Sequence, residues 1–337
     1  MSHRIALEGK DLVKFFPTGS SRILGRPTNN VRAVDGVSFS VRTGTTLGIV
    51  GESGCGKSTL ARVATRLIDS TSGSIFLDGE EITKSSGSAL RLSRRKIQMI
   101  FQDPYSSLNP RHSVGQIIGA PLQVQKISPA QGEKVRVQEL MELVGLNPEH
   151  YNRYPHEFSG GQRQRIGIAR ALILDPTVIV ADEPVSALDV SIQAQILNLL
   201  EGLQRDLGLS YVFIAHDLSV VRHIADDVAV MYLGKIVETG PASVVYQSPA
   251  HPYTKALLSA VPVANPARRG DHERIRLVGD VPSPIDPPSG CRFRTRCWLA
   301  TDKCAQEEPA LAPDASGRLV ACHFPLESSL SSPASAV

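Results

Sequence analysis

The chain has 337 residues, of which 42% are hydrophobic and 20% are charged, as in globular proteins that bury a sizeable core. Its formal net charge of +3 is too small to indicate a nucleic-acid partner, so we expect none. The charged start, "MSHRIALEGK", differs from a signal peptide, and no uncharged apolar stretch reaches the roughly 18 residues of a membrane span. These features predict a cytoplasmic protein with reduced thiols.

Strand and helix patterns alternate up to about residue 261. The apolar runs at 45–50, 177–182 and 211–216 predict buried strands, and the repeat of Ile192, Ile196, Leu199, Leu200 and Leu203 predicts a helix. This alternation predicts an α/β fold around a largely parallel sheet. Antiparallel additions are expected at 37–41, 73–79 and around Leu233-Gly234. We expect the insertion at 17–30 to be a mobile surface loop.

Proline content separates the rest of the chain from this first part. Ten of the 23 prolines lie in the last 76 residues. We therefore predict a first domain over 1–261, a small irregular domain over 262–325, and a disordered tail over 326–337, which is small and polar.

The strongest motif is "GIVGESGCGKST" (48–59), which follows an apolar strand and opens a helix. Gly51-x4-Gly56-Lys57-Ser58 in this context indicates a phosphate-binding loop rather than a simple turn. Lys57 should reach the β- and γ-phosphates, and Ser58 should bind Mg²⁺. The predicted ATP contacts in this loop are Gly51, Ser53, Gly54, Cys55, Gly56, Lys57, Ser58 and Thr59.

Cys55 lies inside the phosphate-binding loop and has two interpretations. Proximity to a helix N-terminus would lower its thiol pKa and make it oxidisable. Alternatively it is a small filler at a permissive position.

Two adjacent acidic residues in "TVIVADEP" (177–184) stand at the end of a strand and complete a nucleotide site. Asp182 stands at the carboxyl end of a buried strand, where α/β sheets place ligands, and can hold Mg²⁺. Glu183 could activate the attacking water as general base. Alone, such a pair is often a solvated strand end; next to a phosphate loop, the site interpretation is favoured.

A second helix start, "FSGGQ" (158–162), offers further backbone donors to an anion, although a plain glycine-rich cap would look the same. With the phosphate loop, "VIVADEP", "SALD" (186–189) and "AHD" (215–217), it gives five motifs in the order and spacing of the ABC transporter ATPases. The sequence closely resembles this family. The resemblance implies a P-loop NTPase fold with an antiparallel β subdomain and a helical subdomain at about 103–170.

The resemblance also implies roles for residues outside the phosphate loop. Gln102 would contact Mg²⁺ and the water, and His216 would sense the γ-phosphate beside Glu183. Phe16 would stack on adenine, although core burial competes for it, and Arg153 would contact the opposing nucleotide, unless it is solvated surface. Asp189 would link the two ATP sites. Ser159, Gly160, Gly161 and Gln162 would complete the ATP site of a second chain.

The family resemblance further implies a head-to-tail dimer and membrane partners. "FQDPYSSLNPR" (101–111), "RYPHEFSGGQRQRI" (153–166) and "SPAHPYTKALLSAVP" (248–262) resemble the ATPases of dipeptide and oligopeptide importers, in particular the F-type subunit. This implies a D-type ATPase partner, two permease subunits, an extracytoplasmic substrate-binding protein, and a peripheral location on the cytoplasmic membrane face. Glutathione or nickel or another metal chelate is an alternative cargo. A DNA-repair ABC ATPase would need a second cassette and a basic DNA path, which the sequence lacks.

Four of the five cysteines, Cys291, Cys297, Cys304 and Cys322, lie near the end of the chain. Their spacings lack both the tight pairs of zinc sites and the ferredoxin pattern, and disulfides conflict with a reducing compartment. The resemblance implies a 4Fe–4S cluster with a structural task, and zinc is the alternative. Arg292, Arg294 and Arg296 would offset its charge or be solvated. Replacing Cys297 by Ser is expected to leave nucleotide affinity nearly intact.

Overall fold

The computed structural model describes residues 4–20, 27–261 and 274–326. Its elements in chain order are β1 (Ile5–Ser20), β2 (Pro27–Arg42), β3 (Thr46–Val50), α1 (Lys57–Ala64), β4 (Ser72–Leu77), β5 (Glu80–Glu81), α2 (Gly87–Lys96), β6 (Ile97–Ile100), α3 (Val114–Gln125), α4 (Glu133–Leu143), η1 (Pro148–Asn152), η2 (Pro155–Glu157), α5 (Gly160–Leu172), β7 (Val178–Asp182), α6 (Val190–Leu207), β8 (Ser210–Ala215), α7 (Leu218–Ile224), β9 (Asp227–Tyr232), β10 (Lys235–Pro241), α8 (Ala242–Gln247), α9 (Pro252–Ala260), α10 (Asp302–Gln306), β11 (Ala312–Pro313) and β12 (Leu319–Val320).

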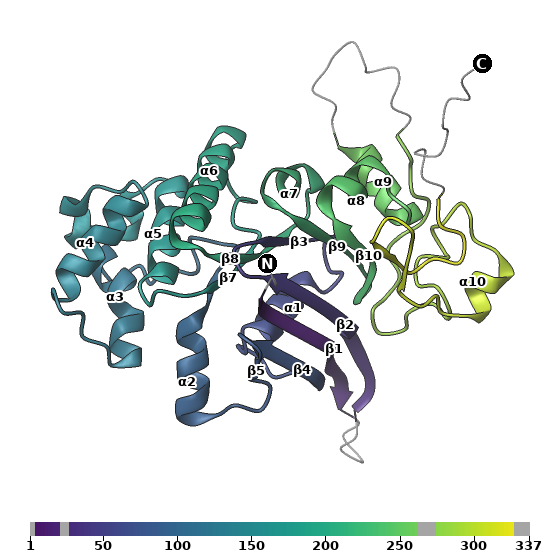
Figure 1. Cartoon of the computed structure of the whole chain (residues 1–337), viewed down its shortest axis with the longest axis horizontal. Coiled ribbons are helices and arrows are strands. Elements are labelled where there is room, and N and C mark those ends of the chain that lie inside the picture. The colour runs from purple at the N-terminus through teal and green to yellow at the C-terminus, as the bar shows by residue number, and fades with distance from the viewer. Residues whose placement is uncertain (1–3, 21–26, 262–273, 327–337) are drawn as a thin grey trace, which may run out of the picture.

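The strands form two sheets, which Figure 1 shows one above the other. The larger sheet has the order β11-β12-β10-β9-β3-β8-β7-β6, and the pairs from β9 to β6 are parallel. The smaller sheet, β2-β1-β4-β5, is antiparallel. The predicted α/β fold and its antiparallel additions, including the β9–β10 pair at Leu233-Gly234, are therefore confirmed.

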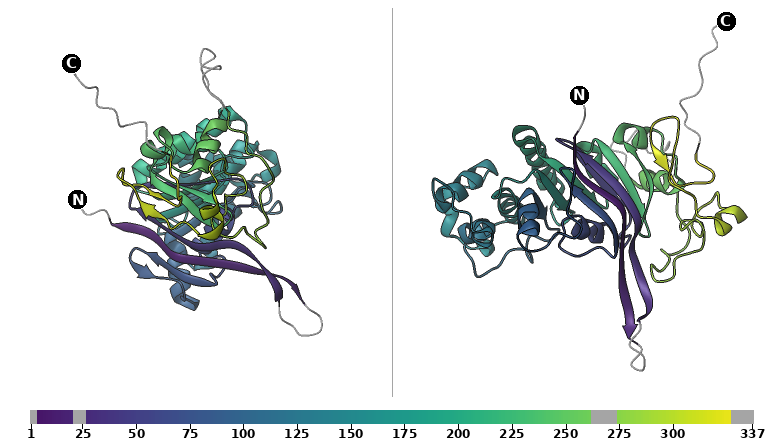
Figure 2. Two further views of the ribbon diagram at one scale, coloured as in Figure 1. Left: turned by 90° about the vertical axis from the view of Figure 1, so that its right-hand side faces the viewer. Right: turned by 60° about the horizontal axis from the view of Figure 1, so that its bottom comes forward.

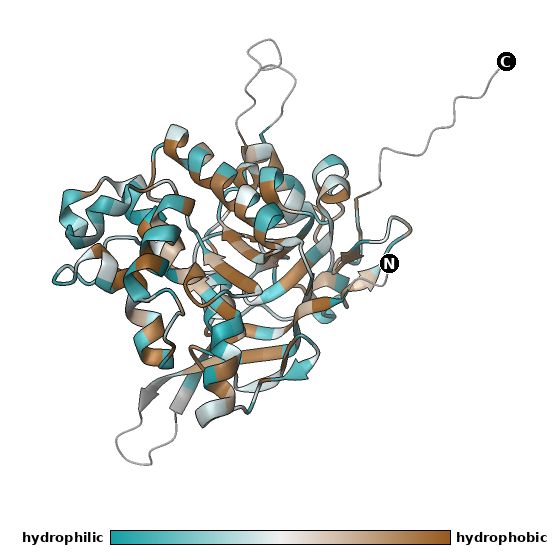
Figure 3. Ribbon diagram, turned by 60° about the vertical axis from the view of Figure 1, so that its left-hand side comes forward, coloured by the Kyte–Doolittle hydropathy of each residue, from teal (hydrophilic) through white to brown (hydrophobic). Residues whose placement is uncertain are grey.

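The central strands are buried on both faces because each face supports a separate apolar core. Along β7, Ile179 and Ala181 belong to the core under α5, α6 and α7. Val178 and Val180 belong to the core shared with α1 and the smaller sheet. Alternation along a strand sends successive side chains to opposite faces, so a continuous apolar run is needed here. Figure 3 shows these strands as largely hydrophobic between helices with polar outer faces.

Helices α3, α4 and α5 pack together beside the larger sheet (Figure 1). Their contact is apolar and includes Ile118, Leu140 and Ile166, none of which is exposed by more than 2%. The predicted helical subdomain over about 103–170 corresponds to these helices and the two 3₁₀ turns before α5. Its limits, like the other domain boundaries, remain predictions.

The 17–30 segment differs from the expected surface loop. Pro17 pairs with Asn30 and Thr18 with Asn29, so the ends of this segment extend the β1–β2 ladder. Figure 2 shows these two long strands projecting together from the body. Residues 21–26 lie outside the described residues. The expectation was wrong for the paired ends, because "PTGS" and "PTNN" consist of residues typical of turns and have no alternation of apolar and polar residues to read.

The C-terminal region is more ordered than its proline content suggests. Its short strand β12 pairs with β10 at the edge of the larger sheet, and β11 pairs with β12. The predicted tail lies outside the described residues from 327 onward. Among the helices that the structure describes, none combines the length and apolar character needed to cross a bilayer.

Candidate functional site

The phosphate-binding loop connects β3, which is buried throughout, to α1. Gly51, Gly54 and Gly56 have φ angles of 157°, 79° and 107°. A Cβ at Gly51 would lie 2.2 Å from the Met231 carbonyl oxygen, and one at Gly56 would lie 1.9 Å from that of Ala33. Both positions therefore require glycine, because the neighbouring atoms are backbone and cannot move aside.

Lys57 and Ser58 begin α1 and face the mouth of the loop. The Lys57 Nζ donates to the carbonyl oxygens of Gly51 (2.8 Å) and Glu52 (3.0 Å). The Ser58 hydroxyl donates to Asp182 Oδ1 at 2.9 Å, joining the loop to the end of β7. This contact brings together two residues that are 124 positions apart, as predicted for a nucleotide site.

The carboxylate of Asp182 fits a cation ligand. Asp182 is only 2% exposed, and burial raises its pKa, although the Ser58 hydroxyl opposes that shift. Burial removes this carboxylate from the water that would stabilise its charge, and a bound divalent cation would stabilise that charge instead. Mg²⁺ prefers oxygen ligands such as this carboxylate. Ser58 and Asp182 could therefore hold Mg²⁺; their role as ligands, like that of Gln102, stays a prediction.

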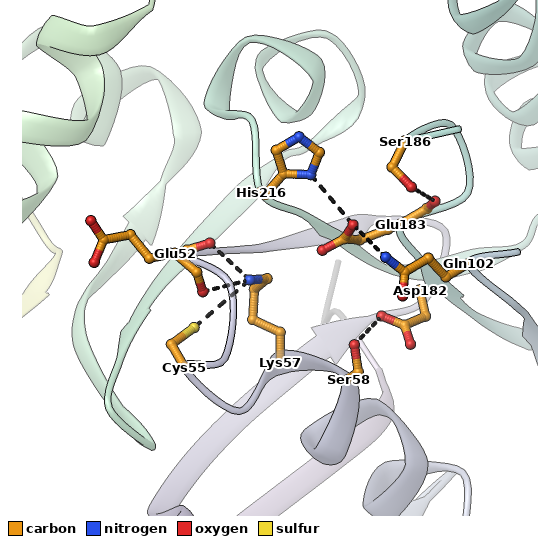
Figure 4. A network of polar contacts seen from close by, with 10 residues as sticks. Glu52, Cys55, Lys57, Ser58, Gln102, Asp182, Glu183, Ser186 and His216 are labelled. Atoms are coloured by element: carbon orange, nitrogen blue, oxygen red, sulfur yellow. Dashed lines mark hydrogen bonds and ion pairs between the residues drawn. The ribbon is translucent and has the colours of Figure 1, made fainter. Parts of the chain in front are cut away.

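Glu183 is the centre of a polar network at the edge of the sheet (Figure 4). Its Oε2 accepts from Gln102 Nε2 at 2.9 Å and lies 3.4 Å from His216 Nδ1. The backbone at Glu183 has a φ of 46°, and its N–H donates to the Ile214 carbonyl. Such left-handed backbone is uncommon outside glycine and is held here by the adjacent strand β8. The three predicted catalytic residues are thus brought together.

A pocket of about 450 Å³ opens over the loop. Its lining includes nine predicted site residues: Phe16, Ser53, Gly54, Gly56, Lys57, Ser58, Thr59, Gln102 and Glu183. Phe16 is 38% exposed, so it faces the pocket instead of the core. Val31, Ala33 and Pro284 also line the pocket and were missed. No sequence motif marks them, and Pro284 comes from the C-terminal region.

Cys55 is 3% exposed and does not line this pocket. Burial raises the pKa of its thiol. Lys57, whose Nζ is 3.8 Å from the sulfur, lowers this pKa, but the effect of burial is larger. The raised pKa contradicts an oxidisable thiol at the helix N-terminus and supports the filler alternative, because the thiolate is the reactive form.

The second helix start lies outside the pocket. Ser159 caps α5: its hydroxyl accepts from the Gln162 N–H at 3.4 Å, and the Gln162 side chain accepts from the Ser159 N–H at 2.9 Å. Ser159 and Gln162 are exposed, and Gly160 and Gly161 are partly exposed. Arg153 and Asp189 are exposed too, and neither lines the pocket. These six residues are available on the surface and do not join the site within their own chain.

The four C-terminal cysteines line one small cavity together with His251, Phe293 and His323. All are free thiols, and burial raises the pKa of Cys291, Cys297 and Cys322, the last to about 11. No group of three or more potential ligands among the described residues is arranged to hold one metal ion. The four thiols share one cavity and equal four in number, and whether they hold a metal centre stays a prediction.

Two of the three nearby arginines are not solvated. The Arg292 guanidinium contacts Asp35 and the Leu233 carbonyl oxygen, and Arg296 forms an ion pair with Glu52. Their side chains are only 7% and 8% exposed. The charge of each arginine is therefore already neutralised by a carboxylate of the ATPase body.

Comparisons with known proteins agree with this geometry. Residues 34–186 match the family model described as ABC transporter, and residues 237–304 match the oligopeptide/dipeptide transporter C-terminal region. The dipeptide transport ATP-binding protein DppF of Haemophilus influenzae is 53% identical over 92% of this chain and 94% of its own length. The oligopeptide transport ATP-binding protein AppF of Bacillus subtilis is 54% identical over 94% of this chain and 97% of its own length.

Solved structures show the same cassette fold. The dimeric ATP-binding cassette MJ0796, in a post-hydrolysis state with ADP and phosphate, matches with a TM-score of 0.62 and 27% identity. The match covers 70% of this chain and 98% of the cassette.

Proposed function

The chain belongs to the ATP-binding subunits of ABC transporters, and from this membership we propose that it hydrolyses ATP to drive uptake of dipeptides or oligopeptides across the cytoplasmic membrane. The observation that carries the ATPase role is the pocket in which Lys57, Ser58, Gln102 and Glu183 meet. Peptide cargo is supported by the names of the relatives and by the C-terminal family match.

In this proposal each polar residue of the pocket has one task in phosphoryl transfer. Loop N–H groups and Lys57 bind the phosphates, and Ser58 and Asp182 would hold Mg²⁺, which would offset charge on them. Glu183 accepts a proton from the attacking water, while Gln102 and His216 orient its carboxylate. Phe16, partly exposed at the pocket, offers a face for the adenine.

The hydrolytic site is completed by a second chain. Ser159, Gly160, Gly161 and Gln162 present an exposed helix start, which suits them to a nucleotide bound by another subunit. We assign Arg153 and Asp189 to the same interface. The partner is a D-type ATPase in a head-to-tail heterodimer, attached to two permease subunits on the cytoplasmic face and served by an extracytoplasmic binding protein.

Reconstitution tests the transport role. The complete transporter in vesicles, with ATP inside and a labelled dipeptide or oligopeptide presented with the binding protein, should accumulate the peptide. A Lys57→Ala complex should not. Accumulation of glutathione or a nickel chelate without peptide uptake would contradict peptide cargo and leave the ATPase role intact.

The cysteine cavity is proposed to hold a 4Fe–4S cluster. Its four thiols match the ligand number of such a cluster, whereas a single zinc needs four sulfurs about 2.3 Å from one point. The cluster would tie the C-terminal region to the ATPase body and take no part in hydrolysis.

Metal analysis decides between the two centres. Protein purified without oxygen should be brown, with about four irons and matching acid-labile sulfide per chain. Colourless protein with one zinc per chain and no sulfide would contradict the cluster.

A further inference from the structure

Glu52, the second residue of the phosphate-binding loop, is held at three points. Its N–H donates to the Tyr253 hydroxyl at 2.9 Å, and its carbonyl oxygen accepts from Lys57 Nζ at 3.0 Å. Its carboxylate receives both arms of the Arg296 guanidinium, at 2.6 and 3.0 Å. Two of these three contacts therefore come from residues beyond position 250, and the third comes from Lys57, the lysine assigned to the phosphates.

The Arg296–Glu52 pair has the geometry of a strong ion pair. Two parallel N–H···O bonds match the guanidinium fork to the carboxylate, and such paired bonds fix orientation as well as distance. The Arg296 side chain is 8% exposed and that of Glu52 is 27% exposed, so solvent screens the pair only partly. The pair links positions 244 residues apart.

The groups that carry these contacts are rigidly supported. The Tyr253 ring is fully buried and packs against Tyr232 and Phe293, with centroid distances of 4.7 and 5.3 Å. Phe293 belongs to the same segment as Arg296. The aromatic cluster therefore fixes this segment against the loop, since interlocked buried rings have little freedom to shift.

We propose that Arg296 is a positioning residue for ATP: by holding Glu52 it sets the loop conformation in which Lys57 meets the phosphates. Lys57 bonds to the Glu52 carbonyl oxygen, so rotation of that peptide would move a hydrogen-bond acceptor of the lysine. The C-terminal region also reaches the pocket at Pro284, whose carbonyl oxygen accepts from the Arg32 N–H at 3.0 Å. The inference rests on the ATP site and is independent of the cargo and of what the cysteines bind.

A double-mutant cycle tests the pair in the full-length chain. We expect Arg296→Met to weaken MgATP binding about tenfold in the wild-type background, within the range of coupled charge pairs. In the Glu52→Gln background the same change should cost less than about twofold. Equal losses in both backgrounds would overturn the proposal. If Arg296→Met does not fold, Arg296→Gln replaces it in the cycle.

Arg292→Met is the matched control. Arg292 lies in the same segment and is equally buried, but it holds Asp35 and Leu233 instead of the loop. Both variants should lower the thermal midpoint of the nucleotide-free protein, and only Arg296→Met should weaken ATP binding. The same loss of affinity in both would show that the segment acts only through stability.

Arg296→Lys separates positioning from charge. Lysine keeps the positive charge but cannot make the two-armed contact, so we expect only part of the ATP affinity to return. In the assembled transporter, Arg296→Lys should raise the KM for ATP and leave kcat nearly unchanged. The reason is that a correctly placed loop stabilises the ground state and the transition state equally, so its disturbance weakens both. Full recovery by lysine would show that simple charge compensation is sufficient.

The contact also changes one expectation from the sequence. Cys297 follows Arg296 directly, so a Cys297→Ser change that loosens the segment should release Glu52. We now expect it to weaken ATP binding, and to do so only while Glu52 is present. Unchanged affinity in the folded Cys297→Ser protein would show that Cys297 does not act on the loop.

Discussion

At the scale of single residues, Glu183 shows how the fold presents a carboxylate at the pocket. It follows the last residue of β7 in left-handed backbone, and this turn points its carboxylate toward Gln102 and His216. Conformations of this kind cost roughly 1–3 kcal/mol and persist where neighbouring structure imposes them. Here the neighbour is β8, through the Ile214 carbonyl.

Glu183→Gln should lower hydrolysis by a factor of about 10² to 10⁴ while ATP binding persists, since the amide keeps the shape but cannot accept the proton. Single-turnover hydrolysis in the assembled complex measures the loss. Lys57→Ala is the contrasting variant and should lose ATP binding itself. Near-normal turnover by Glu183→Gln would show that another group activates the water.

Cys55 should resist alkylation, because it is buried and its thiol pKa is raised. Iodoacetamide at pH 7.5, followed by peptide mass spectrometry, should leave Cys55 unmodified in the folded protein and label it after denaturation. Since the thiolate fraction grows with pH, any labelling of the folded protein should increase above pH 9. Rapid labelling at pH 7.5 would show an exposed, activated thiol.

At the scale of elements, the chain provides an internal comparison for the helix start at Ser159. Ser113 caps α3 with the same reciprocal bonds. Its hydroxyl accepts from the Gln116 N–H at 3.4 Å, and the Gln116 side chain accepts from the Ser113 N–H at 2.9 Å. The two caps are therefore equal in local geometry, and only the one at Ser159 carries the proposed contact to a second chain.

Ser159→Ala and Ser113→Ala should each destabilise the chain by about 1 kcal/mol, the usual effect of losing a cap. Only Ser159→Ala should also reduce ATP hydrolysis by the assembled complex, and it should leave ATP binding by the isolated chain unchanged. Urea unfolding and steady-state ATPase assays measure the two effects. Equal activity of both variants in the complex would remove Ser159 from the site.

The elements that the sequence could predict are those with a strong local signal. The strand before Gly51 and the strand ending at Asp182 are continuous apolar runs. Parallel strands bring their carboxyl ends to the same side of a sheet. The contact between Ser58 and Asp182 could therefore be predicted. The two-residue strands β11 and β12 have no periodicity to detect. The ends of the β1–β2 ladder were hidden for a similar reason.

At the scale of the whole molecule, the contacts that escaped prediction join distant parts of the chain. Two such contacts form only when the C-terminal region folds back over the ATPase body. They are the ion pair between Arg296 and Glu52 and the hydrogen bond between Arg32 and Pro284. Neither has a motif, and a lone arginine or proline gives no indication of its partner. The cysteines were predicted to gather, and they do line one cavity.

The pocket over the phosphate-binding loop is lined by Lys57, Ser58, Gln102 and Glu183, and the helix start at Ser159 does not line it. Ser159 and its neighbours are exposed outside the pocket of their own chain, where a second subunit can receive them. Phosphoryl transfer depends on donors around the transferred group, so an open site should bind ATP and hydrolyse it slowly.

The most direct test is ATP turnover per chain, measured for the isolated full-length protein and again after assembly with the second ATPase and the permeases. A shared site predicts that ATP turnover per chain rises at least about tenfold on assembly, which is the scale of the effect of oriented donors on rate. It also predicts that Ser159→Ala removes most of this increase. Light scattering on the same sample establishes the oligomeric state of the isolated chain. A demonstrated monomer that reaches the turnover of the assembled transporter would contradict a shared site.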